Sequence, residues 1–225
     1  MKKIIYSTAV ILLMTSAVNL KAQTMELKTI ADSVSYAIGV SIGNNLKVGG
    51  FENMNTDMIS KAMVSALKGE QLLIDPTKAN QVITDYMSAQ KAKKGEANKS
   101  KGEAFLTENK KKKGVTTLPD GLQYEVIKQG TGAKPTKDDK VKVHYHGTLI
   151  DGTVFDSSVQ RNEPATFGVT QVIKGWTEIL QMMPVGSKYK ICLPYDLAYG
   201  EHGAGGQIGP YETLIFEVEL LEIVK

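Results

Sequence analysis

The sequence predicts an α+β fold: a carboxy-terminal antiparallel sheet wrapped on one short helix, preceded by an all-helical domain and a long linker helix. Three observations support this prediction. Apolar residues recur at helical spacing between residues 34 and 67. Residues 88–113 hold nine Lys, three Glu and few apolar side chains. Residues 141–149 and 213–224 alternate between apolar and polar side chains, which is typical of half-buried strands.

The amino terminus has the pattern of a secretory signal peptide. A cationic start at Lys2 and Lys3 precedes an apolar run over residues 4–18, and Ala22 ends a segment resembling a cleavage site. We expect residues 1–22 to be removed on export to the periplasm or the outer membrane. The alternative is an uncleaved membrane anchor, for which the apolar run is short. Without residues 1–22 the chain is close to neutral, so its charge does not predict nucleic-acid binding.

Two amphipathic helices are expected between residues 26 and 75. Asp32 or Ser33 is the predicted cap of the first helix, and Asn55 or Thr56 the predicted cap of the second. Gly69 ends the second helix. The apolar stripes consist of Val34, Ile38, Ile42 and Leu46, and then of Met58, Ile59, Ala62, Met63, Ala66 and Leu67. Two such helices bury little alone, so we predict a homodimer through residues 26–75. Packing against the rest of the same chain is the alternative.

A long linker helix is predicted for residues 76–114. Asp75 and Pro76 form a strong helix start, with Asp as the cap and Pro in the first helical position. The Lys-rich sequence that follows is typical of a solvated helix or of a disordered tether. Gly95 and Gly102 each cost a helix about 1 kcal/mol, so a helix interrupted at these positions is the alternative to a continuous one. The run Lys110–Lys113 is interpreted as a solvated surface rather than a contact for acidic partners.

The third segment, residues 115–225, has the pattern of a sheet domain. Asp151 and Gly152 form a hairpin turn signal, and a short helix is expected over residues 176–183. Strands are expected at residues 122–127, 141–149, 188–193 and 213–224. The single cysteine, Cys192, lies in one of these strands and is expected to be a buried, inert thiol.

Motifs for covalent catalysis and for metal binding are missing from the sequence. It has no nucleophile elbow, no phosphate-binding loop and no zinc-binding pair of cysteines. His144 and His146 share one side of a strand without a third ligand close by, so we interpret them as surface residues, and His202 lies in a glycine-rich loop. We therefore expect no metal and no cofactor.

Several motifs resemble the FKBP-type peptidyl-prolyl cis/trans isomerases, in the order and spacing of that family. They are Val143-His-Tyr-His-Gly-Thr-Leu, Asp151-Gly-Thr-Val-Phe-Asp-Ser-Ser, Gln171-Val-Ile-Lys-Gly-Trp, Leu197-Ala-Tyr-Gly and Thr213-Leu-Ile-Phe-Glu-Val-Glu-Leu. Residues 101–110, Pro164-Ala-Thr-Phe and Gly206-Gln-Ile-Gly-Pro-Tyr-Glu-Thr are similar to the Mip/FkpA-like subfamily. That resemblance implies exported dimers in which residues 23–75 are a dimerisation domain and residues 115–225 the isomerase domain.

The resemblance also implies a set of site residues. The expected walls of a proline pocket are Tyr145, Phe155, Val172, Ile173, Trp176, Tyr199 and Phe216, with Trp176 as the floor. Asp156 is expected at the rim as an acceptor, Arg161 holds Asp156 or Tyr145, and Ala198 and Ile208 extend the apolar rim. Ala165, Ala204 and Gly209 depart from the broader family, which leaves substrate preference and the affinity for macrolide inhibitors open.

These residues suit catalysis without a covalent step. The barrier to rotation about a peptide bond is roughly 18–20 kcal/mol, and a pocket that favours the twisted X–Pro amide lowers it by differential binding. The expected function is isomerisation of proline bonds in unfolded or nascent exported chains, with an accompanying chaperone activity. A peptide-binding chaperone without catalysis and a surface protein that contacts acidic partners are the alternatives.

Overall fold

The computed structural model describes residues 26–51 and 53–224. The predicted signal peptide, residues 1–22, lies outside the described residues. The chain divides into two compact units at residues 73 and 74, and each unit is described by itself.

The first unit contains two helices, α1 (Ile30–Val48) and α2 (Thr56–Lys68). The predicted caps of α1 were wrong. Thr29 caps the helix, because its hydroxyl accepts a hydrogen bond from the backbone of Asp32, whose carboxylate accepts one from the backbone of Thr29. In α2 the prediction is confirmed for Asn55, which accepts a hydrogen bond from the Met58 backbone at 3.0 Å. Gly69 ends α2 in the left-handed conformation.

Much of the apolar surface of both helices remains exposed within this unit. Residues 30–48 and 56–68 contain no buried side chain. Ile30, Val34 and Ile38 on α1, and Met58 and Leu67 on α2, are exposed. In the part of the chain that the structure describes, no helix combines the length and apolar character needed to span a bilayer.

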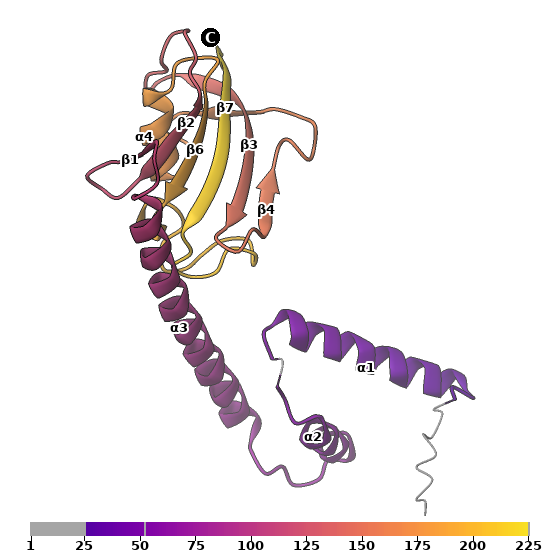
Figure 1. Ribbon diagram of the computed structural model, residues 1–225. Helices are drawn as coiled ribbons and strands as arrows, with labels where there is room; N and C mark the ends of the chain where they lie inside the picture. Colours follow the sequence, from indigo (N-terminus) through magenta and orange to yellow (C-terminus); the bar gives the residue numbers. More distant parts are fainter. Residues whose placement is uncertain (1–25, 52, 225) are drawn as a thin grey trace, which may run out of the picture. The chain divides into compact units, whose positions relative to one another are not determined.

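The second unit begins with the long helix α3 (Pro76–Asn109), drawn in purple in Figure 1. Asp75 caps it by accepting hydrogen bonds from two backbone amides of the first turn. The predicted linker helix is confirmed, and it is continuous through Gly95 and Gly102. Both glycines are buried, since they lie where the helix packs against the sheet domain, and a side chain at Gly95 would come within 2.8 Å of the Tyr211 ring.

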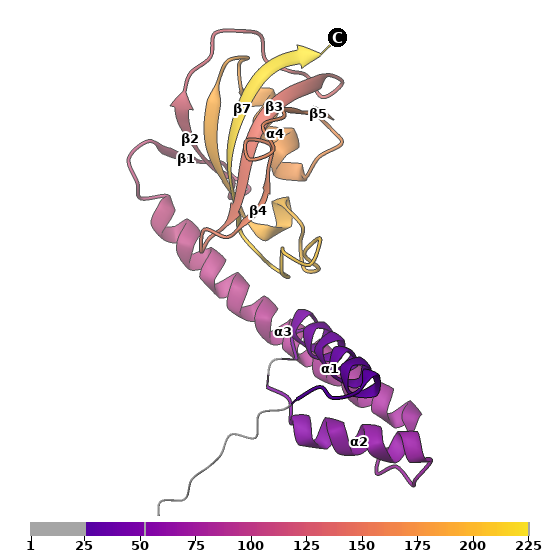
Figure 2. The same cartoon turned by 90° about the vertical axis from the view of Figure 1, so that its right-hand side faces the viewer.

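The sheet domain of the second unit has seven antiparallel strands and the short helix α4 (Lys174–Met182), which confirms the predicted fold class. The strands are β1 (Val115–Thr117), β2 (Gln123–Lys128), β3 (Lys140–Leu149), β4 (Val154–Ser157), β5 (Ala165–Gly168), β6 (Lys188–Leu193) and β7 (Leu214–Val224). Their order is β1-β2-β6-β7-β3-β4, and β5 pairs with the first half of β3. Figure 1 and Figure 2 show the curved sheet with α4 against one face.

The core lies between this face and α4. On β3 the buried side chains alternate with partly exposed ones, as the sequence predicted, so that Val141, Val143 and Tyr145 face inward. α4 contributes Trp176, Ile179 and Leu180 to the same core. The predicted hairpin turn at Asp151-Gly152 is also confirmed, since the Leu149 amide donates to the Thr153 carbonyl across it at 2.9 Å.

Cys192 lies on β6 and is buried, as predicted. Burial raises the pKa of its thiol to about 11. The thiol accepts a hydrogen bond from the Asn109 side chain at 3.6 Å, at the carboxy-terminal end of α3.

Candidate active site

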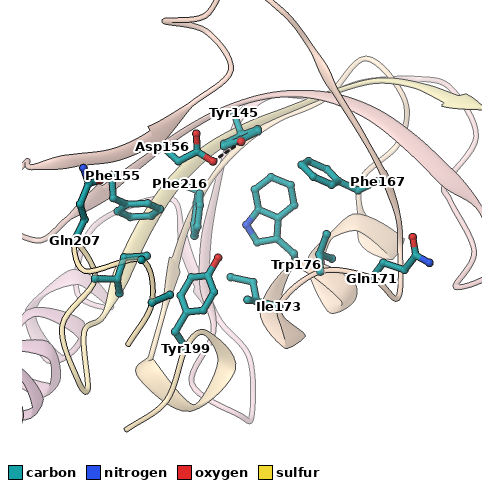
Figure 3. Close-up of a pocket in the computed structure, with 14 residues that line it drawn as sticks. Tyr145, Phe155, Asp156, Phe167, Gln171, Ile173, Trp176, Tyr199, Gln207 and Phe216 are labelled. Atoms are coloured by element: carbon teal, nitrogen blue, oxygen red, sulfur yellow. Dashed lines mark hydrogen bonds between the residues drawn. The ribbon is translucent and has the colours of Figure 1, made fainter. Parts of the chain in front are cut away.

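A cavity of about 630 Å³ opens between the inner face of the sheet, the start of α4 and the segment that precedes β7 (Figure 3). Its lining is dominated by rings and aliphatic groups. The lining residues are Tyr145, Phe155, Asp156, Phe167, Gln171, Val172, Ile173, Trp176, Tyr199, Ala204, Gly205, Gln207, Ile208 and Phe216. Volume and composition are those of a small-molecule or peptide-side-chain site.

Trp176 forms the floor of the cavity and is 4% exposed. It lies in the first turn of α4, whose cap residue is Ile173, so the helix start presents both residues to the cavity. Three rings pack against the indole edge-to-face: Tyr145 at 5.4 Å, Phe216 at 5.3 Å and Phe167 at 6.0 Å between centroids. This arrangement, favoured by the quadrupoles of the rings, fixes the floor in one orientation.

Phe155 and Phe216 form an aromatic wall of the cavity, and their packing depends on a glycine. Gly147 lies on β3 directly opposite Phe216 of β7. A methyl group there would approach the Phe155 ring to 2.7 Å and the Phe216 ring to 2.9 Å. Glycine therefore lets these two rings meet edge-to-face, with 5.4 Å between their centroids, over the strand backbone.

A hydrogen-bonded network of three residues closes one side of the cavity. The Tyr145 hydroxyl on β3 donates to Oδ2 of Asp156 on β4 at 2.5 Å. The guanidinium of Arg161 donates to Oδ1 of Asp156, and also to the Tyr145 hydroxyl at 2.9 Å. Beneath the network, the Tyr145 amide donates to the hydroxyl of the fully buried Ser158 at 2.7 Å.

This network fixes the charge state of its members. Desolvation by itself raises the pKa of Asp156, but the hydrogen bonds from Tyr145 and Arg161 outweigh it and hold the pKa below its ordinary value. Burial, followed by the hydrogen bond to Asp156, raises the pKa of Tyr145. At neutral pH Asp156 is therefore an ionised acceptor and Tyr145 a neutral donor. A carboxylate held in this way is a weak proton acceptor, so the network orients groups instead of abstracting protons.

Tyr199 faces this network from the opposite side of the cavity. Its ring is 40% exposed at the mouth, and its hydroxyl points into the cavity (Figure 3). Burial raises the pKa of Tyr199. The neutral hydroxyl is thus placed where it can donate to a carbonyl of an entering peptide.

The structure brings together most of the residues expected from the sequence. Nine of them line the cavity: Tyr145, Phe155, Asp156, Val172, Ile173, Trp176, Tyr199, Ile208 and Phe216. Arg161 does not line the cavity and acts from behind through Asp156 and Tyr145, while Ala198 packs against the core away from the lining. Their catalytic roles stay predictions.

Other lining residues were missed. Phe167, Gln171, Gly205 and Gln207 were not expected in the site, and Ala204 was noted only as a departure from the family. Phe167, Gln171 and Gln207 had a signal, because they belong to motifs of the resemblance, but no place in the site was inferred for them. The two glutamines and Gly205 lie on loops, where no periodicity indicates which side chain faces inward.

The two histidines of β3 lie outside the cavity. They are partly exposed, and their Nδ1 atoms lie within hydrogen-bond distance of the hydroxyls of Ser158 and Ser157, at 3.1 Å for His144 and 2.9 Å for His146. Residues 26–51 and 53–224 contain no cluster of three His, Cys, Asp or Glu side chains suited to a metal ion.

Two family models match the chain, and together they span most of it. The model described as "FKBP-type peptidyl-prolyl cis-trans isomerase" matches residues 131–221. The model described as "Domain amino terminal to FKBP-type peptidyl-prolyl isomerase" matches residues 31–126. With the fold, the ring-lined cavity and the relatives below, these matches show that the chain belongs to the FKBP-type peptidyl-prolyl cis-trans isomerases.

The relatives narrow the position within the family. "Outer membrane protein MIP" of Legionella longbeachae is 45% identical over 232 residues, covering 100% of this chain and 99% of that protein. "FKBP-type 22 kDa peptidyl-prolyl cis-trans isomerase" of Escherichia coli is 45% identical over 204 residues, covering 89% of this chain and 99% of that protein. The crystal structure of FkpA from Escherichia coli matches with a TM-score of 0.70 and 34% identity, covering 88% of this chain and 98% of that one. The predicted similarity to the Mip/FkpA-like isomerases is confirmed, and the protein is a peptidyl-prolyl isomerase.

Proposed function

We propose that the cavity on Trp176 binds the proline of an X–Pro bond and accelerates its rotation, in chains that fold after export. The single observation that carries the proposal is the cavity itself. A floor and wall of interlocked rings adjoin a neutral tyrosine and an ionised, fully engaged aspartate. Such a site suits an uncharged ring and the amide attached to it.

The rings act by excluding water from the amide. Resonance in a peptide bond separates charge, and water stabilises the separated form. Trp176 and Phe216 are almost completely buried, so a proline seated against them leaves the carbonyl of the X–Pro amide in a poorly solvated place. The planar amide then loses part of its stabilisation relative to the twisted one, which lowers the barrier.

Polar groups at the mouth hold the flanking peptide. The Tyr199 hydroxyl and the Ile173 backbone amide are the proposed donors to substrate carbonyls, since both residues line the cavity. Asp156 and Arg161 keep the Tyr145 ring in position, because its hydroxyl is bonded to both. The substrate is thereby held in a turn that matches the twisted amide.

An isomerisation assay without a coupling protease tests this proposal. Residues 23–225 are compared with the variants Asp156→Ala and Tyr199→Phe on a short X–Pro peptide. Matched controls are Asp138→Ala, an exposed aspartate away from the cavity, and Tyr124→Phe, whose ring stacks on Tyr189 outside it. We expect kcat/KM to fall in the first pair only. Equal rates in all five proteins would show that the reaction occurs elsewhere.

A homodimer through residues 26–75 is part of the proposed function. The support is the uncovered apolar surface of α1 and α2, which a second copy would bury. Sedimentation equilibrium tests it: we expect twice the chain mass for residues 23–225 and the chain mass for residues 74–225. A single chain mass for the longer protein would contradict the dimer.

We also propose a chaperone activity, in which the dimer holds unfolded clients. If the clients bind outside the cavity, Asp156→Ala suppresses isomerisation and leaves the prevention of client aggregation unchanged. Loss of both activities together would show that the cavity also holds the client. Export is tested independently by the amino-terminal sequence of the protein in the periplasm or outer membrane, which we expect to start at Gln23.

The cavity is also the proposed site for macrolide inhibitors, because its volume is in the range of small-molecule sites. Competition between a macrolide and the X–Pro peptide would support this assignment. Inhibition that does not compete with the peptide would contradict it.

A further inference from the structure

One wall of the cavity is built by irregular chain instead of by the sheet. Tyr199, Ala204, Gly205, Gln207 and Ile208 all come from the segment 199–213, between the short 3-10 helix (Tyr195–Leu197) and β7. We call this segment the rim segment. Since no strand ladder holds it, its position depends on the contacts that it makes elsewhere.

Inside the rim segment only a few contacts hold its shape. Ala204 and Ile208 exchange backbone hydrogen bonds of 2.9 and 3.0 Å, and the Tyr211 amide donates to the Gly200 carbonyl at 3.0 Å. Tyr211 has a φ of 56°, in the left-handed region that bulky residues avoid. Its ring packs edge-to-face on Tyr195 at 5.0 Å. A strained residue of this kind persists where its surroundings hold it firmly.

Helix α3 supplies the external support. The Asn98 side chain is 9% exposed, and its Nδ2 donates to the carbonyl of Pro210 at 2.9 Å. One turn earlier Gly95 lies against the Tyr211 ring, and one turn later Gly102 lies against the Thr213 side chain. Positions 95, 98 and 102 share one helix face, so the whole face is fitted to the end of the rim segment.

Asn98 can approach the rim segment closely because residue 209 is a glycine. A methyl group at Gly209 would lie 3.0 Å from Nδ2 of Asn98, which is tighter than ordinary contact. Its neighbour on one side is Ile208, which lines the cavity, and on the other Pro210, which accepts the hydrogen bond. The contact with α3 is therefore two residues from the cavity wall.

We propose that Asn98 is a positioning residue for proline isomerisation: through Pro210 it holds the rim segment, and with it Ile208 and Tyr199, in the geometry that binds substrate. The proposal rests on the assignment of the cavity as the isomerase site. It makes the linker helix a working part of the active site as well as a connection between domains.

Asn109 provides a matched control on the same helix. It is also buried, at 7% exposed, and its Nδ2 donates to Oε1 of Gln123 at 2.9 Å and to Cys192. These partners lie on β2 and β6 and do not line the cavity. Removing either side chain deletes buried hydrogen bonds between α3 and the sheet domain, one for Asn98 and two for Asn109, but of the two only Asn98 touches the rim segment.

The experiment uses residues 23–225 with Asn98→Ala, Asn98→Asp or Asn109→Ala. The first readout is the separate measurement of kcat and KM on a short X–Pro peptide. The second is acrylamide quenching of tryptophan fluorescence, which reports on the cavity directly because Trp176 is the only tryptophan in the chain. All measurements are made well below the unfolding transition of each variant.

For Asn98→Ala we expect kcat/KM to fall about fivefold, mainly through KM, as for the loss of one net hydrogen bond, and quenching to increase. Asn98→Asp keeps the shape but presents an acceptor to the Pro210 carbonyl, so its loss should be at least as large. Asn109→Ala should stay within about twofold of the parent in kcat/KM and leave quenching unchanged.

Equal effects of Asn98→Ala and Asn109→Ala on both readouts would overturn the proposal, as would a parent-like Asn98→Asp. Failure of the underlying site assignment is distinguishable. In that case Asp156→Ala keeps its activity, while quenching in Asn98→Ala still increases if the rim segment is held as described.

Discussion

Gly147→Ala is the sharpest test of how the aromatic wall is built. The added methyl group would lie 2.7 Å from two atoms of the Phe155 ring and 2.9 Å from one atom of the Phe216 ring. Carbon atoms in contact prefer separations of about 3.5–4.0 Å. Both rings therefore have to move away from the added methyl group by up to about 1 Å.

The two rings differ in their freedom to move. Phe216 is held against Trp176 and belongs to the buried core, whereas Phe155 is partly exposed at the cavity wall. Phe155 should move most and change the shape of the cavity. Overpacking of this kind costs about 1–3 kcal/mol of unfolding free energy. At about 2 kcal/mol the melting temperature falls by about 4–8 °C for a unit of this size.

The assay combines thermal unfolding, followed by circular dichroism, with kcat/KM on an X–Pro peptide. We expect a fall in kcat/KM of about tenfold, equivalent to about 1.4 kcal/mol of transition-state binding. Gly152→Ala is the control: Gly152 has a positive φ, so alanine is strained there, but the new methyl group meets no atom within 4 Å. It should lower stability and leave kcat/KM unchanged. A Gly147→Ala protein with parental melting temperature and kcat/KM would refute the reasoning.

Three further predictions concern the charges and the caps. Arg161→Gln removes donors from Asp156, so the pKa of Asp156 should rise toward its ordinary value in a carbon-13 NMR titration; an unchanged pKa would contradict the network. A hydrogen bond and repulsion from Asp120, with desolvation, raise the pKa of Glu178 from 4.5 to about 7, so the free energy of unfolding should decrease as pH rises from 4.5 to 7; urea titrations of Asp120→Asn should show that decrease, about 1 kcal/mol or less for partly exposed groups, removed. Thr29→Ala deletes the cap of α1 and should destabilise the first unit by about 1 kcal/mol in thermal unfolding of the full chain, whereas Ser35→Ala, within the helix, should not.

Much of the fold follows from local pattern. The alternation in β3 and in residues 214–220 of β7, the Asp75-Pro76 start of α3 and the hairpin turn at Asp151 are each determined by a few neighbouring residues. The structure has them as predicted. The cap of α1 was assigned wrongly because several capping residues occur together. Thr29 and Asp32 form a reciprocal pair, and only the pair shows which residue precedes the helix.

The glycines of α3 show what local pattern leaves out. In isolation Gly95 and Gly102 weaken a helix, and this argument left an interrupted helix open as an alternative. Their effect is reversed by tertiary packing, because the Tyr211 ring and the Thr213 side chain occupy the space of the absent side chains. Nothing in the sequence around position 95 indicates a partner more than a hundred residues away.

The site was predictable as far as the resemblance extended. From alternation alone Tyr145 and Phe216 belong to the core, and the structure shows that they are core and cavity wall at once. Gln171 and Gln207 were missed because loop side chains take their direction from the folded backbone. Arg161 was expected to hold Asp156 or Tyr145, and in the structure its guanidinium donates hydrogen bonds to both.

The lone thiol has a consequence for the surroundings in which the protein can work. With a pKa of about 11, Cys192 is ionised in only about one molecule in ten thousand at pH 7. The thiolate is the form that attacks disulfides, so we expect the buried thiol to react slowly with disulfides. No disulfide within the chain contributes to its stability, because it has a single cysteine. We therefore expect thiol–disulfide chemistry to leave the fold and the activity unchanged under both reducing and oxidising conditions.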